Sequence, residues 1–271
     1  MNNRANIYRC IGATLAAVLV TSCAQEEAPN DAATANNDVT VTAEDAIKMA
    51  IVHNGRTAED LADDQSRKPF EVLTFIGVEP NLTVFEMEAG RGYYTELFSH
   101  IVGQNGQIHM QNPASFDAFL GDAVEVRLAE NRLPNVTPTK SNFDNLQADD
   151  ASVDVVTWVL GPHELFFTPS EGVSLGEVEQ TYAEIIRILK PGGRFVVLDH
   201  AAAPGSSVDS GQTLHRIDPI IVRSLAETAG LELIDESDVL RNSDDDYSVH
   251  VFDSSVRRQT DRFLMKFRKL P

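Results

Sequence analysis

The chain has 271 residues, with 22 Lys and Arg against 41 Asp and Glu, which gives a formal net charge of −19. Such an acidic surface repels nucleic acid, so the composition disfavours a DNA or RNA substrate. The two cysteines, Cys10 and Cys23, both lie near the start of the chain, so the body that follows has no disulfide, thiolate metal site or cysteine nucleophile. Its length suits one α/β domain rather than two.

The first residues carry the pattern of a processing signal. Arg4 and Arg9 make the start positive, and residues 11–20 form an apolar run that is too short to span a bilayer. Small residues then precede Cys23, which resembles the lipobox of bacterial lipoproteins. That resemblance implies cleavage before Cys23, lipidation of its sulfur and acylation of the new amino terminus. An ordinary secretory signal cut near Ala24 is the alternative.

This start predicts the organisation of the whole chain. We expect residues 1–22 to be a lipoprotein signal peptide, residues 23–42 a disordered tether, and residues 43–271 the folded domain. Several acyl chains on one residue anchor a protein stably to a membrane. Because Ala24 follows Cys23, the lipoprotein pattern favours the outer membrane, with the protein exported and facing the periplasm.

The elements alternate along the chain between helices and strands. Apolar residues at three- and four-residue spacing predict helices near 43–54, 56–66, 69–76, 93–102, 114–130, 175–189 and 217–229. Short apolar runs predict strands near 82–86, 107–111, 136–140, 153–158, 194–199, 231–239 and 263–269. This order predicts an α/β fold: a doubly wound, mostly parallel, seven-stranded sheet covered on both faces. The last two strands follow each other without a strong helix between them.

A strand, a glycine turn and a helix follow one another in residues 82–97. The strand ends at Glu86, the turn contains Gly90 and Gly92, and the helix begins at Tyr93. Glycine tolerates positive φ and lets backbone N–H groups approach a ligand closely. The order is typical of a nucleotide-binding site, although two such glycines also occur in plain turns.

Two later segments strengthen this interpretation. Residues 149–160 form a turn and a buried strand, and residues 182–200 form a helix, a Leu-Lys-Pro-Gly-Gly stop and another strand. With residues 82–97, they resemble the class I S-adenosylmethionine-dependent methyltransferases in order, spacing and residue type. A group of exported bacterial proteins labelled predicted methyltransferases is similar over roughly residues 55–271, with matching blocks at 67–73, 199–202, 214–218, 240–245 and 260–269. The resemblance implies a Rossmann-like sheet with an antiparallel last strand and S-adenosylmethionine as cofactor.

The resemblance also implies which residues hold the cofactor. Ligands of doubly wound sheets bind at the carboxyl ends of the strands. In the family pattern, the acid at Glu86 helps hold the methionine portion, and the glycines at Gly90 and Gly92 line its backbone. The remaining implied cofactor-binding positions are Glu88, Tyr94, Asn112, Asn142, Phe143 and Leu160.

Three of these positions depart from the family pattern. Glu88 stands where the first of three glycines is usual, and Asn112, next to Gln111, replaces the carboxylate that accepts the ribose hydroxyls. Asn142 replaces the aspartate that accepts from the adenine amino group. Charge-assisted hydrogen bonds are about twice as strong as neutral ones, so the amides predict weaker nucleotide binding or another pose.

His163 and His200 are the candidate catalytic acid/base groups, because each ends a predicted strand and an unperturbed histidine titrates near neutral pH. Structural histidines bonded to backbone carbonyls are the alternative. A zinc site built from the same two histidines with carboxylates is a further alternative, but the spacing forms no dedicated motif, so we expect no metal. The other histidines are interpreted as surface or packing residues: His53, His100, His109, His215 and His250.

Two functions remain open. The first is a lipid-anchored S-adenosylmethionine-dependent methyltransferase that acts on a small molecule or on a component of the cell envelope. The second is a non-catalytic lipoprotein that keeps the methyltransferase fold as a ligand-binding or assembly module. Export favours the second, since S-adenosylmethionine is made in the cytoplasm, whereas the glycine turn and the paired histidines favour the first. The sequence indicates no particular oligomeric state.

Overall fold

The computed structural model describes residues 41–271, so the predictions for Cys23, the signal peptide and all but the last two residues of the tether lie outside it. Three helices open the described chain, and their starts are visible in the sequence: α1 (Ala43–Ile51), α2 (Ala58–Arg67) and α3 (Pro69–Ile76). The hydroxyls of Thr42 and Thr57 accept backbone N–H groups in the first turns of α1 and α2. A proline, which needs no N–H partner there, begins α3.

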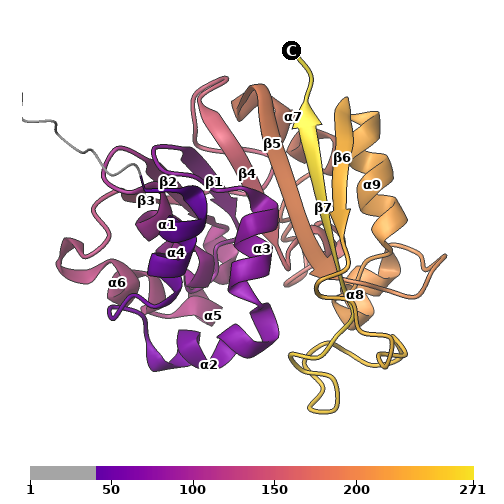
Figure 1. Cartoon of the computed structure of the whole chain (residues 1–271). Coiled ribbons are helices and arrows are strands. Elements are labelled where there is room, and N and C mark those ends of the chain that lie inside the picture. The colour runs from indigo at the N-terminus through magenta and orange to yellow at the C-terminus, as the bar shows by residue number, and fades with distance from the viewer. Residues whose placement is uncertain (1–40) are drawn as a thin grey trace, which may run out of the picture. The chain divides into compact units, whose positions relative to one another are not determined.

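Seven strands form one sheet in the order β3-β2-β1-β4-β5-β7-β6. They are β1 (Thr83–Met87), β2 (Gln107–Asn112), β3 (Val136–Lys140), β4 (Val153–Val159), β5 (Leu189–His200), β6 (Leu231–Ser237) and β7 (Arg262–Lys269). The first five pair in parallel, and β7 runs antiparallel to both β5 and β6, as Figure 1 shows. The predicted doubly wound sheet with an antiparallel last strand is therefore confirmed.

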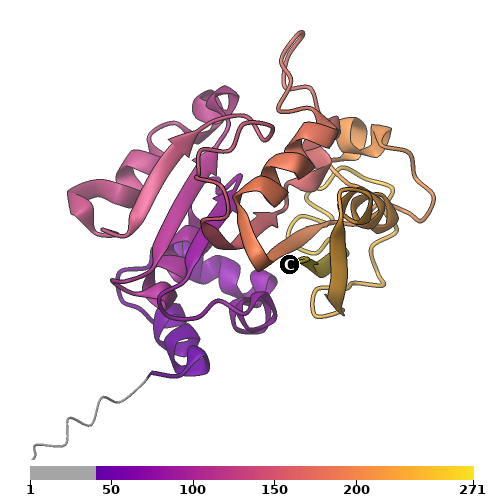
Figure 2. The same cartoon turned by 90° about the horizontal axis from the view of Figure 1, so that it is seen from above.

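Helices cover both faces of the sheet. On one face, Val84 and Val155 pack against α1, α3 and α4 (Tyr93–Val102). Their neighbours in sequence, Phe85 and Val156, point to the other face and pack against α7 (Val178–Ile188) and α9 (Pro219–Thr228). Figure 2 shows these two groups of helices on opposite sides of the sheet. Each central strand is buried on both faces, which explains its near-continuous apolar sequence.

Some boundaries differ from the sequence expectation. The helix expected over residues 114–130 is broken into η1 (Ala114–Phe116), α5 (Asp117–Leu120), α6 (Ala123–Leu128) and η2 (Ala129–Asn131). Gly121 at φ 59° ends α5, and Glu130 at φ 56° ends the helical run again, because a left-handed residue cannot continue a right-handed helix. The strand expected over residues 194–199 starts earlier in the structure, since β5 already pairs with β4 at Leu189.

Two short elements were not predicted, namely η3 (Pro162–Phe166), which follows β4, and α8 (Asp209–Leu214), which follows β5. They pack together at the carboxyl ends of the parallel strands, and α2 and the yellow loop before β7 lie at the same end of the sheet in Figure 1. This is the end at which doubly wound folds bind ligands. Among the described helices, none combines the length and the apolar character that a bilayer crossing requires.

Candidate functional site

A cleft of about 530 Å³ opens at the carboxyl ends of β1 and β4 and beside the end of β5. Its wall combines the glycine turn after β1, the side of α2, and the chain that leads into β7. Six of the residues predicted from the sequence line it: Glu86, Glu88, Gly90, Tyr94, Leu160 and His200. Acidic side chains and guanidinium groups both line it, so the cleft suits a polar ligand with an anionic group.

The two glycines of the turn have different surroundings. Gly90 has φ 58°, and a Cβ built on it would meet nothing within 4 Å, so its open side faces the cleft. Gly92 has φ 84° and begins α4, but its Cβ would lie 3.0 Å from Cε of Met110 and 3.3 Å from Cγ of Arg127. Gly90 therefore offers room for a ligand, whereas Gly92 allows close packing inside the protein.

Side-chain amides at the end of β2 fasten this turn. The Asn112 side chain accepts the N–H of Gly90 at 2.8 Å and donates to its carbonyl at 3.1 Å. Gln111 accepts the N–H of Glu88 at 2.9 Å and donates to the carbonyl of Ser141 at 2.6 Å. A carboxylate accepts hydrogen bonds but donates none when ionised, so only an amide makes both contacts. The departure from the family pattern at Asn112 thus has a structural use, which the sequence did not reveal.

The two acids of the turn are held apart. Glu86 is 2% exposed and accepts a short hydrogen bond from the hydroxyl of Thr95. Burial raises the pKa of Glu86 to about 8. Glu88 has φ 51°, and its carboxylate accepts the indole N–H of Trp158 at 3.0 Å, next to Gly161. Glu88 therefore lies toward β4 and leaves the open side of Gly90 clear.

Arg262 supplies a buried positive charge to the same cleft. It is 8% exposed, and one of its terminal nitrogens donates to the carbonyl of Ser66 at 2.7 Å. Its Nε has no hydrogen-bond partner, and within residues 41–271 it forms no ion pair with a carboxylate. By contrast, Arg127 in the same wall contacts Asp60 and Glu96 at 2.6 Å each. A buried cation without a counter-ion is costly, so Arg262 is prepared to receive an anionic group.

The two candidate acid/base histidines lie together, with ring centroids 6.2 Å apart, but only His200 lines the cleft. Its Nδ1 lies 2.7 Å from the hydroxyl of Thr260. Burial, together with the charges of His163 and Arg262, lowers the pKa of His200 well below its usual range, which favours a neutral ring. His163 is 3% exposed and bonds Asp199 at 2.8 Å through Nδ1. Burial alone would lower the pKa of His163, but Asp199 and Glu164 raise it to about 10.

Four predicted cofactor positions do not line the cleft, and Gly92, which packs inside the protein, is one of them. Asn112 faces the glycine turn as described above, and the Asn142 amide donates to the carbonyl of Ser174 at 3.1 Å on the exposed surface. Phe143 is fully buried, and its ring packs against Trp158 with centroids 4.8 Å apart. The roles assigned to these residues from the family pattern stay predictions, whereas the importance of Arg262 was missed because nothing local in the sequence marks it.

The chain is similar to known methyltransferases in sequence. The profile of the family described as "Methyltransferase domain" matches residues 85–197, which span β1 to β5. The ubiquinone/menaquinone biosynthesis C-methyltransferase UbiE of Shewanella piezotolerans is 27% identical over 123 residues, which cover 45% of this chain and 44% of that protein. The Proteus mirabilis protein of the same name is 26% identical over 152 residues. The chain thus spans about half the length of the curated relatives it matches.

Solved structures share the fold over more of the chain. A SAM-dependent methyltransferase from Aquifex aeolicus superposes with a TM-score of 0.55 at 18% identity, covering 78% of this chain and 96% of that one. The geranyl diphosphate C-methyltransferase of Streptomyces coelicolor also gives a TM-score of 0.55, at 12% identity, covering 82% and 89% of the two chains. The seven-stranded sheet thus has the Rossmann-like fold of these methyltransferases, and the segment from β1 to β5 is similar in sequence to the methyltransferase family.

Proposed function

We propose that the protein is an S-adenosylmethionine-dependent methyltransferase that binds its cofactor in the cleft over Gly90. The observation that carries this proposal is the open side of Gly90, where a Cβ would meet nothing within 4 Å at the wall of a cleft of about 530 Å³. The side chains also fit a ligand with an amino-acid end and a sulfonium. Arg262 and Arg67 would hold its carboxylate, and oxygens of Glu86 and Glu88 would accept hydrogen bonds from its amino group.

Bound there, S-adenosylmethionine would supply an electrophilic methyl group. The protein would then contribute mainly position, because holding two reactants in line accounts for much of the rate of such a transfer. In this proposal, His200 would remove a proton from the acceptor. When its Nδ1 donates to Thr260, its Nε2 keeps the lone pair that a base requires.

The substrate we propose is a small molecule or a component of the cell envelope. The named relatives are C-methyltransferases of quinone biosynthesis, and one structural neighbour methylates geranyl diphosphate. The strong negative charge of the chain argues against nucleic acid as the acceptor. The lipobox-like sequence before Cys23 supports export and a lipid anchor facing the periplasm, with the outer membrane favoured. Cys23→Ser should abolish detergent-dependent extraction, and a mature chain without acyl mass would exclude the anchor.

Methyl transfer can be followed with S-adenosylmethionine that carries a labelled methyl group. The purified protein is incubated with this cofactor and a solvent extract of cell envelopes, and the label in the extract is counted. His200→Gln should reduce labelling by about 10²–10⁴-fold if His200 is the base, while cofactor affinity changes little. If the wild-type protein neither binds the cofactor nor transfers label, the chain is instead a non-catalytic binding or assembly module with the same fold.

A further inference from the structure

Three side chains meet behind His200, at the junction of η3 and α8. Nε2 of His163 lies 3.1 Å from Nδ1 of His215 and 3.3 Å from Oε1 of Glu164. Nδ1 of His215 lies 3.2 Å from the same carboxylate oxygen. The three donor atoms therefore form a nearly equilateral triangle. His215 had been interpreted as a surface or packing residue, but its side chain is only 12% exposed and belongs to this group.

The edges of the triangle match the face of a tetrahedral metal site. Nitrogen and oxygen ligands bind Zn²⁺ at about 2.0–2.1 Å, so neighbouring ligand atoms of a tetrahedron lie about 3.3–3.4 Å apart. The observed edges of 3.1, 3.3 and 3.2 Å come close to this spacing. Protons alone explain the triangle less well. Nε2 of His163 and Nδ1 of His215 each carry at most one hydrogen. If both hydrogens are donated to Glu164, no proton remains between the two nitrogens to hold them together.

A carboxylate behind His163 fixes the direction of its ring. Asp199 is fully buried, and its oxygens lie 2.8 and 3.0 Å from Nδ1 of His163. The same carboxylate accepts the backbone N–H groups of His163 at 2.8 Å and His200 at 2.7 Å, so it is itself held in place. In metal sites, a ligating histidine almost always donates its other ring N–H to such a group. Asp199 therefore fixes the ring of His163 so that its Nε2 stays on the side of Glu164 and His215.

Glu164 gives an independent sign of a missing partner. The residue is 7% exposed, and its second oxygen, Oε2, has no hydrogen-bond partner among the described residues. A buried carboxylate oxygen without a partner is costly, because it has lost water and gained nothing in exchange. A cation bound at the triangle would neutralise this carboxylate.

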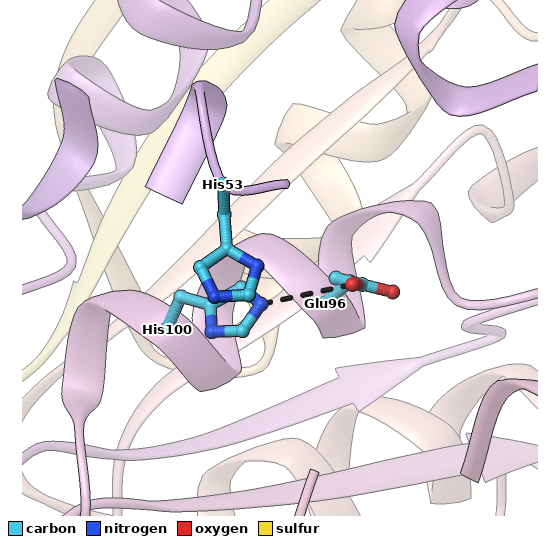
Figure 3. A group of neighbouring side chains, drawn as sticks. All are labelled: His53, Glu96 and His100. Atoms are coloured by element: carbon cyan, nitrogen blue, oxygen red, sulfur yellow. Dashed lines mark ion pairs between the residues drawn. The ribbon is translucent and has the colours of Figure 1, made fainter. Parts of the chain in front are cut away.

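A second group of two histidines and a glutamate lacks these features. Figure 3 shows the side chains of His53, Glu96 and His100 grouped together, and one possible ligand atom of each lies within 4.8 Å of the others. However, the two imidazoles stack with centroids 3.7 Å apart, and both oxygens of Glu96 are already bonded by Arg127 and Arg132. A metal ion there would have to displace two guanidinium groups from the one carboxylate. This group therefore serves as a natural control.

We propose that His163, Glu164 and His215 bind a single zinc ion, with Asp199 orienting His163. Two imidazoles and a carboxylate suit zinc, and three protein ligands leave its fourth position open. The ion would join η3, which follows β4, to the end of α8. Its ligand His163 packs next to His200, which lines the cleft. This site does not depend on the proposed methyltransferase activity, because its ligands lie outside the lining of the cleft.

Zinc titration of the untagged protein, stripped with a chelator, tests the site. Wild-type protein should bind one zinc ion by calorimetry and by metal analysis after gel filtration. At zinc 100-fold above the dissociation constant, Tm should rise by about 5–10 °C. His215→Asn should weaken zinc binding by at least about 100-fold, since it removes a ligand. Asparagine suits this position because His215 has φ 52° and asparagine tolerates the left-handed region.

His100→Gln is the matched control and should bind zinc like the wild type. Glu164→Gln preserves the shape of the side chain, so it tests the site even if the change at His215 prevents folding, and it should weaken binding at least tenfold. Cobalt in place of zinc should give the visible absorption of a tetrahedral ion in the wild type and lose it in Glu164→Gln. The proposal is overturned if the stripped wild type takes up no zinc, or if His100→Gln loses as much affinity as Glu164→Gln.

Discussion

Adding one methyl group at Gly90 should separate ligand binding from folding. Gly90 has φ 58°, and a left-handed backbone costs an L-residue about 1–2 kcal/mol. Because no atom lies within 4 Å of the added Cβ, Gly90→Ala should lose stability by about that amount and no more. For a domain of this size, the loss corresponds to a fall in Tm of about 2–8 °C.

The same methyl group would project into the cleft, over the surface where the cofactor is proposed to lie. The turn has little freedom to withdraw, since Asn112 bonds both the N–H and the carbonyl of Gly90. We therefore expect the dissociation constant for S-adenosylmethionine to rise at least about tenfold, a change of about 1.4 kcal/mol.

Gly192→Ala is the matched control. Gly192 also has positive φ, at 76°, and its Cβ would likewise meet nothing within 4 Å. It lies near the start of β5, eight residues before the His200 that lines the cleft, which is about 25 Å along an extended strand. Thermal melts and calorimetric titrations should show the same loss of stability in both variants, but weaker binding in Gly90→Ala alone. Unchanged affinity in Gly90→Ala would refute a cofactor lying over the glycine turn.

Three further changes test the charges around the cleft. Arg262→Met should leave Tm unchanged or higher, because it removes a buried charge that has no ion-pair partner. In a titration the same variant should bind the cofactor at least tenfold more weakly. Unchanged affinity would show that Arg262 does not contact the cofactor. Glu86 has its pKa raised to about 8, so its protonated form favours folding below the unfolded pKa near 4.5, and this stability is lost as pH rises through 8. Urea unfolding between pH 5 and 8.5 should therefore show a decline of a few kcal/mol in the wild type that Glu86→Gln flattens; parallel profiles would contradict the raised pKa. Burial alone would raise the pKa of Glu96, but hydrogen bonds from His100, Arg132 and Arg127 lower it. The ionised carboxylate should therefore stabilise the fold above its unfolded pKa, and this stability should be lost in acid. Glu96→Ala should cost about 3–5 kcal/mol in urea unfolding at pH 7. A loss below about 1 kcal/mol would show that the arginines find other partners.

Periodicity predicted the sheet because its central strands bury both faces. Apolar runs such as residues 153–158 leave few alternatives to a parallel strand that is buried on both faces. The glycine turn indicated the end of the sheet at which a ligand binds. The break in residues 114–130 is only partly visible in the sequence. Gly121 is a residue type that favours a left-handed conformation, whereas Glu130 is not, so residue type marks the first break and not the second.

The site was predictable where the chain itself brings residues together. Glu86, Gly90 and Tyr94 belong to one strand-turn-helix unit and reach the cleft as expected. Arg262 enters from the last strand, and His215 joins His163 across 52 residues of sequence, so neither has a local pattern that shows its neighbours.

Asn112 shows why a departure from the family pattern is hard to interpret from sequence. Asn112 was expected to be a weaker ribose ligand, since an amide replaces a carboxylate there. In the structure the amide is occupied by the backbone of Gly90, both as acceptor and as donor. A single sequence cannot distinguish a weakened ligand from a residue that supports the turn, because both require the same side chain at the same place.

Calorimetric titration of residues 41–271 with S-adenosylmethionine is the sharpest test of whether this compound binds in the cleft beside Gly90. We expect one site with a dissociation constant below about 1 mM, competition by S-adenosylhomocysteine, and weaker binding in Gly90→Ala but not in Gly192→Ala. Absence of heat and of chemical-shift change at millimolar S-adenosylmethionine, with the protein folded, would contradict this expectation.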